Sequence, residues 1–166
     1  MRVAVAFVLL VSCARAPLQP LTIAARDGNA PEIRALVARG ADANAFDGVN
    51  DWTPLEHAVH KHQPAAITAL LDVGADPNRA DPRGSTPLMM AAGYGSTDIV
   101  QLLLRRGADL RLRDSGGATA LDWAVSGIND IDRFTLFDCQ APTIEVLRKA
   151  GAPAGTDKSI AKLKRC

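Results

Sequence analysis

The stretch of sequence that decides the fold runs from residue 81 to residue 109. It reads DPRGSTPLMMAAGYG and then STDIVQLLLRRGAD. Thr86 can cap a first helix with its hydroxyl, and Pro87 suits the first helical position. Gly95 ends this helix, because glycine adopts a left-handed conformation without strain. A second helix is indicated by apolar residues at helical spacing, which are Ile99, Val100, Leu103 and Leu104, followed by Gly107.

The same pattern returns along the chain. The threonines Thr53, Thr86 and Thr119 are spaced by 33 residues, and each is followed two positions later by a leucine. The tripeptide Gly-Ala-Asp closes successive units at 40–42, 74–76 and 107–109. A period of 33 residues with these opening and closing motifs resembles the ankyrin repeat.

The resemblance covers about residues 18–153 and implies an all-α repeat solenoid of four ankyrin repeats. In this fold, pairs of helices are joined by short β-hairpin fingers. We place the repeats at about 21–52, 53–85, 86–118 and 119–153, followed by a basic tail at 154–166. The family usually has a histidine after Thr-Pro-Leu. Here Glu56, Met89 and Asp122 replace it, and we expect the loss of a stabilising hydrogen bond.

Composition and motifs argue for a binding protein and against an enzyme. The chain has 166 residues, 48% of them hydrophobic and 22% charged, which suits one soluble domain. A net charge of +1 argues against a nucleic-acid partner. We find no Gly-x-Ser-x-Gly, phosphate-binding glycine loop or His-Glu-x-x-His motif. We therefore expect no catalytic residue, cofactor or metal, and a monomer.

The N-terminus differs from the repeats. Met1-Arg2 is followed by nine apolar residues and then by Ser12-Cys13-Ala14. Nine residues are too few to span a bilayer, which takes about 20 residues in a helix. A charge followed by a short apolar run and small residues is instead typical of a signal peptide. Leu10-Val11-Ser12-Cys13 resembles the bacterial lipobox, which implies cleavage before Cys13 and lipidation of that residue.

Residues 1–12 would then be the signal peptide and 13–20 a short tether. We therefore expect a lipid-anchored protein of the bacterial cell envelope. Ala14 after the cysteine favours the periplasmic side of the outer membrane over the inner membrane. The alternative is an ordinary signal peptide cut near Ala14 or Ala16, which would leave a soluble periplasmic or secreted protein.

The resemblance also indicates which residues face a protein partner. In the ankyrin pattern, the finger residues, the residue before the threonine and the residues near the helix-ending glycine line a concave surface. The protein-binding candidates at these positions are Trp52, His60, Lys61, Arg83 and Tyr94. Two alternatives stay open: Trp52 packs on a neighbouring finger, or Arg83 is solvated while Tyr94 rests on its own helix.

The fourth repeat contains an insert near 127–141 that includes Phe134 and Phe137. The insert is either a contact loop or a flap over the last helix. As a contact loop it would make the protein an inhibitor or immunity protein that blocks a toxin or enzyme. If Cys13 is lipidated in an oxidising compartment, Cys139 and Cys166 remain as a pair, and we predict a disulfide between them.

Overall fold

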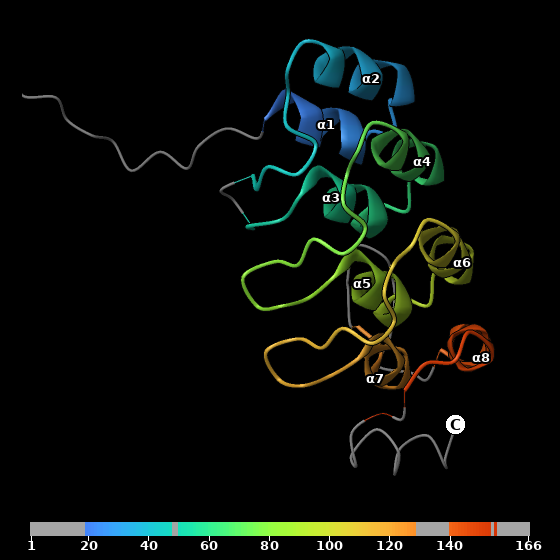
Figure 1. Cartoon of the computed structure of the whole chain (residues 1–166). Helices are drawn as coiled ribbons and strands as arrows, with labels where there is room; N and C mark the ends of the chain where they lie inside the picture. The colour runs from blue at the N-terminus through green and yellow to red at the C-terminus, as the bar shows by residue number, and fades with distance from the viewer. Residues whose placement is uncertain (1–18, 48–49, 129–139, 154, 156–166) are drawn as a thin grey trace, which may run out of the picture.

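The computed structural model describes residues 19–47, 50–128, 140–153 and 155 (Figure 1). Three parts of the sequence predictions lie outside these ranges. They are the N-terminal segment with Cys13, the centre of the insert with Cys139, and the tail with Cys166. Lipidation and the disulfide therefore stay predictions.

Within the described residues the chain forms eight helices in four consecutive pairs. The pairs are α1 (Pro20–Arg26) with α2 (Ala30–Ala38), α3 (Pro54–His60) with α4 (Pro64–Asp72), α5 (Pro87–Gly93) with α6 (Thr97–Arg105), and α7 (Ala120–Ser126) with α8 (Ala141–Lys149). None of these helices is long and apolar enough to cross a membrane. The all-α repeat solenoid that the sequence predicts is confirmed.

The helices stack in two columns (Figure 1). One column holds α1, α3, α5 and α7, which pack on one another in that order, and the other holds α2, α4, α6 and α8. An alanine recurs at the same position of every helix in the first column, and all four are buried: Ala24, Ala58, Ala91 and Ala124. A side chain this small lets neighbouring helices approach closely. The 33-residue period of the sequence therefore becomes a regular stacking of helices in the structure.

The local signals read around α5 are confirmed. Thr86 is the N-cap, and its Oγ1 accepts a hydrogen bond from the backbone N–H of Met89 at 3.3 Å. Pro87 occupies the first helical position. Gly95 follows the helix with φ of +69°, a left-handed value that side chains rarely adopt.

The expectation about the missing family histidine is wrong in two repeats. Glu56 Oε2 accepts a hydrogen bond from the backbone N–H of Thr53 at 2.7 Å, and Asp122 Oδ2 accepts one from Thr119 at 2.8 Å. Each threonine hydroxyl in turn accepts the backbone N–H of its acidic partner. A carboxylate three residues after a threonine thus closes a capping box, which replaces the lost hydrogen bond.

The fingers between the repeats are loops, and no strand forms in the part of the chain that the structure describes. One backbone hydrogen bond closes each finger, joining Asp47 to Trp52, Asp81 to Ser85, and Asp114 to Ala118. The fingers therefore turn like hairpins without a strand ladder in the described residues. They project to the same side of the stack in Figure 1.

Asparagine side chains join one repeat to the next. Asn44 Oδ1 accepts a hydrogen bond from the backbone N–H of Asp76 at 2.8 Å, and its Nδ2 donates to the carbonyl of Gly74 at 3.1 Å. Asn78 makes the same two bonds to the following repeat, at 2.7 and 3.1 Å. Because each amide uses both its donor and its acceptor, these two residues fix the register between neighbouring units.

The fourth repeat holds the long connection, between Ser126 at the end of α7 and Ala141 at the start of α8. As the chain leaves α7, the backbone N–H of Ile128 donates to the carbonyl of Gly93 at 2.9 Å. A Cβ at Gly93 would lie 2.6 Å from Cγ1 of Ile128, so only glycine permits this approach. Residues 129–139 lie outside the described ranges, and the contact loop, the flap and the inhibitor function therefore stay predictions.

Candidate functional site: a cleft between three repeats

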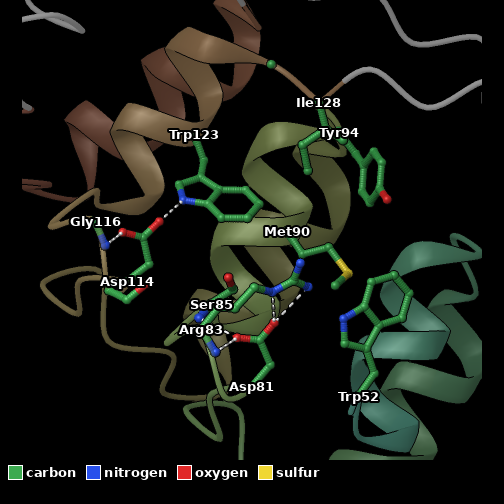
Figure 2. Close-up of a pocket in the computed structure, with 12 residues that line it drawn as sticks. Trp52, Asp81, Arg83, Ser85, Met90, Tyr94, Asp114, Gly116, Trp123 and Ile128 are labelled. Atoms are coloured by element: carbon green, nitrogen blue, oxygen red, sulfur yellow. Dashed lines mark hydrogen bonds and ion pairs between the residues drawn. The ribbon is translucent and has the colours of Figure 1, made fainter. Parts of the chain in front are cut away.

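A cleft of about 630 Å³ opens where the fingers meet the first column of helices (Figure 2). Met90 of α5 and Tyr94, the C-cap of this helix, line it in the middle. Trp52, which precedes α3, lies on one side, and Trp123 of α7 lies on the other. Arg83 reaches in from the finger before α5. Because three successive repeats supply these residues, the cleft exists only when the repeats are stacked.

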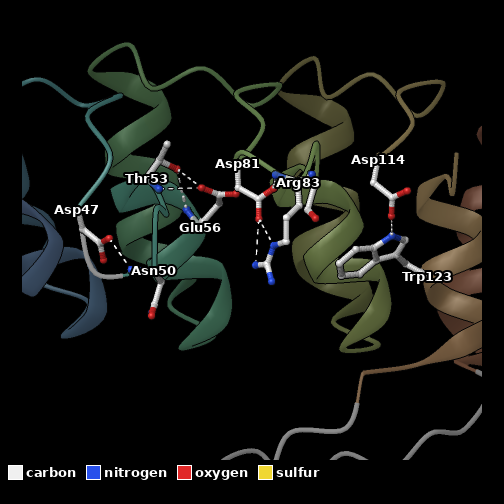
Figure 3. A network of polar contacts seen from close by, with 9 residues as sticks. Asp47, Asn50, Thr53, Glu56, Asp81, Arg83, Asp114 and Trp123 are labelled. Carbon is white, nitrogen blue, oxygen red and sulfur yellow. Dashed lines mark hydrogen bonds and ion pairs between the residues drawn. The ribbon is translucent and has the colours of Figure 1, made fainter. Parts of the chain in front are cut away.

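An aspartate at an equivalent position in each finger organises this side of the molecule (Figure 3). These residues are Asp47, Asp81 and Asp114. In each of them one carboxylate oxygen accepts backbone N–H groups of its own finger, at 2.8–3.0 Å. The other oxygen has a different partner in each repeat, so the three fingers are held in three different ways.

The partner depends on the residue four positions after the capping threonine. In α3 this residue is His57, whose Nε2 hydrogen-bonds to Asp47, and in α7 it is Trp123, whose Nε1 donates to Asp114 at 2.8 Å. In α5 the equivalent residue is Met90, whose side chain has no N–H group to donate. The finger before α5, the middle one of the three, therefore has no side-chain hydrogen bond of this kind to its own helix.

Arg83 takes over this role for the middle finger. Its Nε and Nη2 donate to Oδ2 of Asp81 at 3.2 and 3.1 Å (Figure 2). The side chain of Asp81 is 1% exposed, whereas that of Arg83 is 70% exposed. A buried carboxylate thus holds an exposed guanidinium in the cleft. The alternative of a solvated Arg83 stays open, because most of this side chain is exposed even though it is paired with Asp81.

Three of the predicted binding residues form a row of rings. The rings of Trp52 and His60 are 5.2 Å apart between centroids, and those of His60 and Tyr94 are 5.7 Å apart. His60 Nδ1 also hydrogen-bonds to the hydroxyl of Tyr94 at 2.8 Å. Trp52 packs on α3 through His57 as well, with centroids 5.3 Å apart. The row spans the junction between the second and third repeats.

The structure places the five candidates differently with respect to the cleft. Trp52, Arg83 and Tyr94 line it, although Tyr94 is only 8% exposed and its hydroxyl is engaged by His60. His60 lies beside the cleft and supports the two rings next to it. Lys61 is half-buried as the C-cap of α3 and is not among the lining residues. That these residues bind a partner stays a prediction.

Sequence reasoning missed several residues of this site, above all Trp123, Met90 and Asp114. A signal for two of them was present in the repeat alignment. Trp123 and Met90 occupy the position of His57 in their own repeats, four residues after the threonine. That this position faces the finger rather than the core follows only from the folded geometry.

Two buried titratable groups lie beside the cleft. Glu56 is fully buried, and burial raises its pKa from 4.5 to about 7, with a smaller contribution from the negative charge of Asp81. Burial lowers the pKa of His57 from its ordinary 6.5, although the hydrogen bond to Asp47 acts in the opposite direction. Because a carboxylate can only accept, Nε2–H of His57 is the donor in the hydrogen bond to Asp47.

The three histidines have separate structural partners. His57 contacts Asp47, His60 contacts Tyr94, and the ring of His62 lies 3.2 Å from the hydroxyl of Ser96 and 3.3 Å from Asp98. Within the described ranges, no group of three or more His, Cys, Asp or Glu residues is arranged to hold a metal ion. The histidines thus connect elements of the scaffold.

Comparison with known proteins agrees with this architecture. A family described as "Ankyrin repeats (many copies)" matches residues 70–124, and one described as "Ankyrin repeats (3 copies)" matches residues 4–81. The chain is 38% identical over 87 residues to the Ankyrin repeat protein nuc-2 of Neurospora crassa. It is 41% identical over 102 residues to the SH3 and multiple ankyrin repeat domains protein 1 of Mus musculus. The matches cover 52% and 59% of this chain.

A further relative is the glycerophosphocholine phosphodiesterase gde1 of Schizosaccharomyces pombe, 35% identical over 111 residues, or 66% of this chain. The chain spans 8%, 5% and 10% of nuc-2, the mouse protein and gde1, so it corresponds to a small part of each. All three come from eukaryotes. What these proteins share with this chain is the repeat itself: the chain is built from ankyrin repeats.

Proposed function

We propose that this protein is a non-enzymatic adaptor that binds a protein partner through its concave face and fingers. The observation that carries the proposal is the cleft itself. It brings two tryptophans and an anchored arginine, Trp52, Trp123 and Arg83, into one hollow of about 630 Å³. Tryptophan and arginine are enriched among the residues that dominate binding energy at protein interfaces.

The way in which the cleft is built favours binding over chemistry. Asp81 and Asp114 are hydrogen-bonded to finger backbone, Arg83 and Trp123, so their carboxylates serve to position the walls. A surface that is preformed in this way loses little conformational entropy when a partner binds. The ankyrin relationship supports the same conclusion, because such repeats are interaction modules.

The adaptor is tested by affinity capture from crosslinked envelope membranes. Wild-type protein is compared with a Trp52→Ala/Arg83→Ala double variant and with Arg111→Ala as a matched control. Arg111 is 79% exposed and pairs with Asp109 two residues away, as Arg83 does with Asp81, but it does not line the cleft. We expect one partner with the wild type and the control, and its loss with the double variant. Retention by the double variant would exclude the cleft as the binding site.

We propose further that the adaptor is a monomer anchored at the bacterial cell envelope by lipid on Cys13. The lipobox-like sequence ending at Cys13 supports this location. The seven residues 14–20 reach at most about 25 Å, so the repeats would lie close to the bilayer. Mass spectrometry of the N-terminal peptide tests the anchor: we expect a diacylglyceryl-modified Cys13. A mature chain that begins after Ala14 would contradict it.

A further inference from the structure

The two carboxylates that line the cleft already accept several hydrogen bonds from their own surroundings. Asp81 already accepts four hydrogen bonds, two from backbone N–H groups and two from the Arg83 guanidinium. Asp114 accepts three, from Gly116, Ala118 and the indole of Trp123. The lining carboxylates are therefore nearly saturated and offer little to an incoming cation.

Arg83, in contrast, has donors to spare. A guanidinium carries five N–H bonds, and the contacts with Asp81 use only Nε and Nη2. Nη1 of Arg83 has no hydrogen-bond partner among the described residues, and the side chain is 70% exposed. Figure 2 shows the guanidinium projecting into the cleft between Asp81 and Met90.

The guanidinium is also held in place before any partner arrives. Both the backbone N–H and the side chain of Arg83 bind the buried Asp81. The carbonyl of Arg83 accepts a hydrogen bond from the backbone N–H of Ser115 at 2.8 Å, which attaches this residue to the next finger. A fixed planar fork matches a carboxylate in a bidentate manner, and little entropy remains to be lost.

A second donor and an apolar surface adjoin Arg83. Nε1 of Trp52 is buried and has no acceptor in the described part of the chain, and in Figure 2 it faces the side of the cleft where Arg83 lies. Met90, Trp123 and Ile128 supply apolar surface in the same cleft. An occupant should thus combine an acceptor group with an apolar side chain.

From this inventory we propose that the cleft recognises an acidic segment of a partner protein. An Asp or Glu carboxylate of the partner binds Arg83 through Nη1, on the side away from Asp81. A neighbouring apolar side chain packs on Met90 between the two tryptophans. A basic segment fits less well, because Asp81 is already paired with Arg83 and Asp114 already accepts three hydrogen bonds. The proposal rests on the protein-binding function and specifies the chemistry of the partner.

The chain offers a direct probe of the cleft. Its sequence contains two tryptophans, Trp52 and Trp123, and both line this cleft. Random dodecapeptides displayed on phage are selected on the purified full-length protein. The enriched peptides are then synthesised and titrated while tryptophan fluorescence is followed. We expect enriched peptides that combine Asp or Glu with an adjacent apolar residue and that change the fluorescence on binding.

The role of Arg83 is tested with Arg83→Gln, Arg83→Lys and the control Arg111→Gln. Replacing the acidic residue of a selected peptide by Gln should weaken its binding to the wild type and to Arg111→Gln by about tenfold or more. In Arg83→Gln the same replacement should have little effect, because the partner of the carboxylate is gone. Arg83→Lys keeps the charge and so the fold around Asp81, but it loses the fork and should bind the acidic peptide more weakly than the wild type.

The outcomes separate this inference from the function on which it rests. Enriched peptides that are basic, or acidic peptides that bind Arg83→Gln as well as the wild type, would overturn the acidic-segment proposal and leave the adaptor function standing. If no peptide is enriched and none changes the fluorescence, both proposals are contradicted. Circular dichroism of each variant establishes that a loss of binding is not a loss of fold.

Discussion

The buried carboxyl of Glu56 should make the stability of this protein depend on pH in an unusual direction. Oε2 of Glu56 accepts hydrogen bonds from the N–H and the hydroxyl of Thr53, whereas Oε1 is buried without a partner in the described residues. Burial raises the pKa of this group from 4.5 to about 7. Between these two values the folded protein holds a proton that the unfolded chain releases.

The sign of the effect follows from this difference in proton binding. The neutral carboxyl stabilises the fold fully below pH 4.5, and this stabilisation is lost as the pH rises through about 7. At about 1.36 kcal/mol per pKa unit, the loss amounts to about 3 kcal/mol. Glu56→Gln removes the ionisation and keeps a carbonyl oxygen that can accept the bonds from Thr53. The free energy of unfolding of the variant relative to wild type should therefore rise by about 3 kcal/mol from acidic to mildly alkaline pH.

Comparing variant with wild type is necessary because His57 titrates in the same range. Burial lowers the pKa of His57, so its contribution to stability is present above 6.5 and lost as the pH falls. This acts against the contribution of Glu56 in either protein alone. His57 is present in both proteins, and neither residue contributes to the pKa shift of the other, so the contribution of His57 should cancel in the difference.

The assay is urea denaturation followed by circular dichroism at a series of pH values. Glu145→Gln is the control: the ion pair with Lys149 lowers the pKa of Glu145, so removing this carboxylate should change the difference in the opposite direction. A buried amide that fits poorly at Glu56 would shift the whole curve without changing its slope. A difference between Glu56→Gln and wild type that does not vary with pH would refute the reasoning.

Three further substitutions test other contacts by thermal and urea unfolding. Asn78→Ala removes both bonds between two repeats and should lower the free energy of unfolding by about 1–2 kcal/mol; an unchanged value would show that the register does not depend on this amide. Trp123→Phe leaves Oδ2 of Asp114 without its donor and should cost about 1–3 kcal/mol; wild-type stability would mean that water replaces the indole. Gly95→Ala places a Cβ 2.0 Å from the side-chain amide oxygen of Gln140 at a φ of +69° and should cost at least about 1 kcal/mol; an unchanged free energy of unfolding would show that this position accepts a side chain.

The features that sequence reasoning predicted correctly are those determined by a few neighbouring residues. The cap at Thr86, the proline after it and the left-handed Gly95 act within one or two turns of helix, and all three are as expected. The period then repeats this local information, so the solenoid follows from it. The capping boxes were equally local, since Glu56 stands three residues after Thr53, but comparison with the family histidine hid this signal.

The site was predicted only in part, because its geometry depends on contacts between repeats. Trp52, Arg83 and Tyr94 were assigned from the family's surface positions, and all three line the cleft. That Tyr94 would be 8% exposed depends on His60, which lies 34 residues earlier in the chain. Trp123 is held in the cleft by the hydrogen bond that its Nε1 donates to Asp114. Neither contact can be read from spacing along the chain.

The middle repeat shows how one scaffold position can make a site. In the flanking repeats the finger aspartate is bound by a side chain of its own helix, His57 or Trp123. Where methionine replaces that donor, a buried carboxylate still needs a partner, since an unpaired one would be strongly destabilising. Arg83 supplies this partner from the exposed side. The ion pair that stabilises the fold therefore also keeps a cation in the cleft. Met90→His should reverse this arrangement: if the introduced imidazole bound Asp81, Arg83 would be released, and acidic peptides would bind more weakly although Arg83 itself is unchanged.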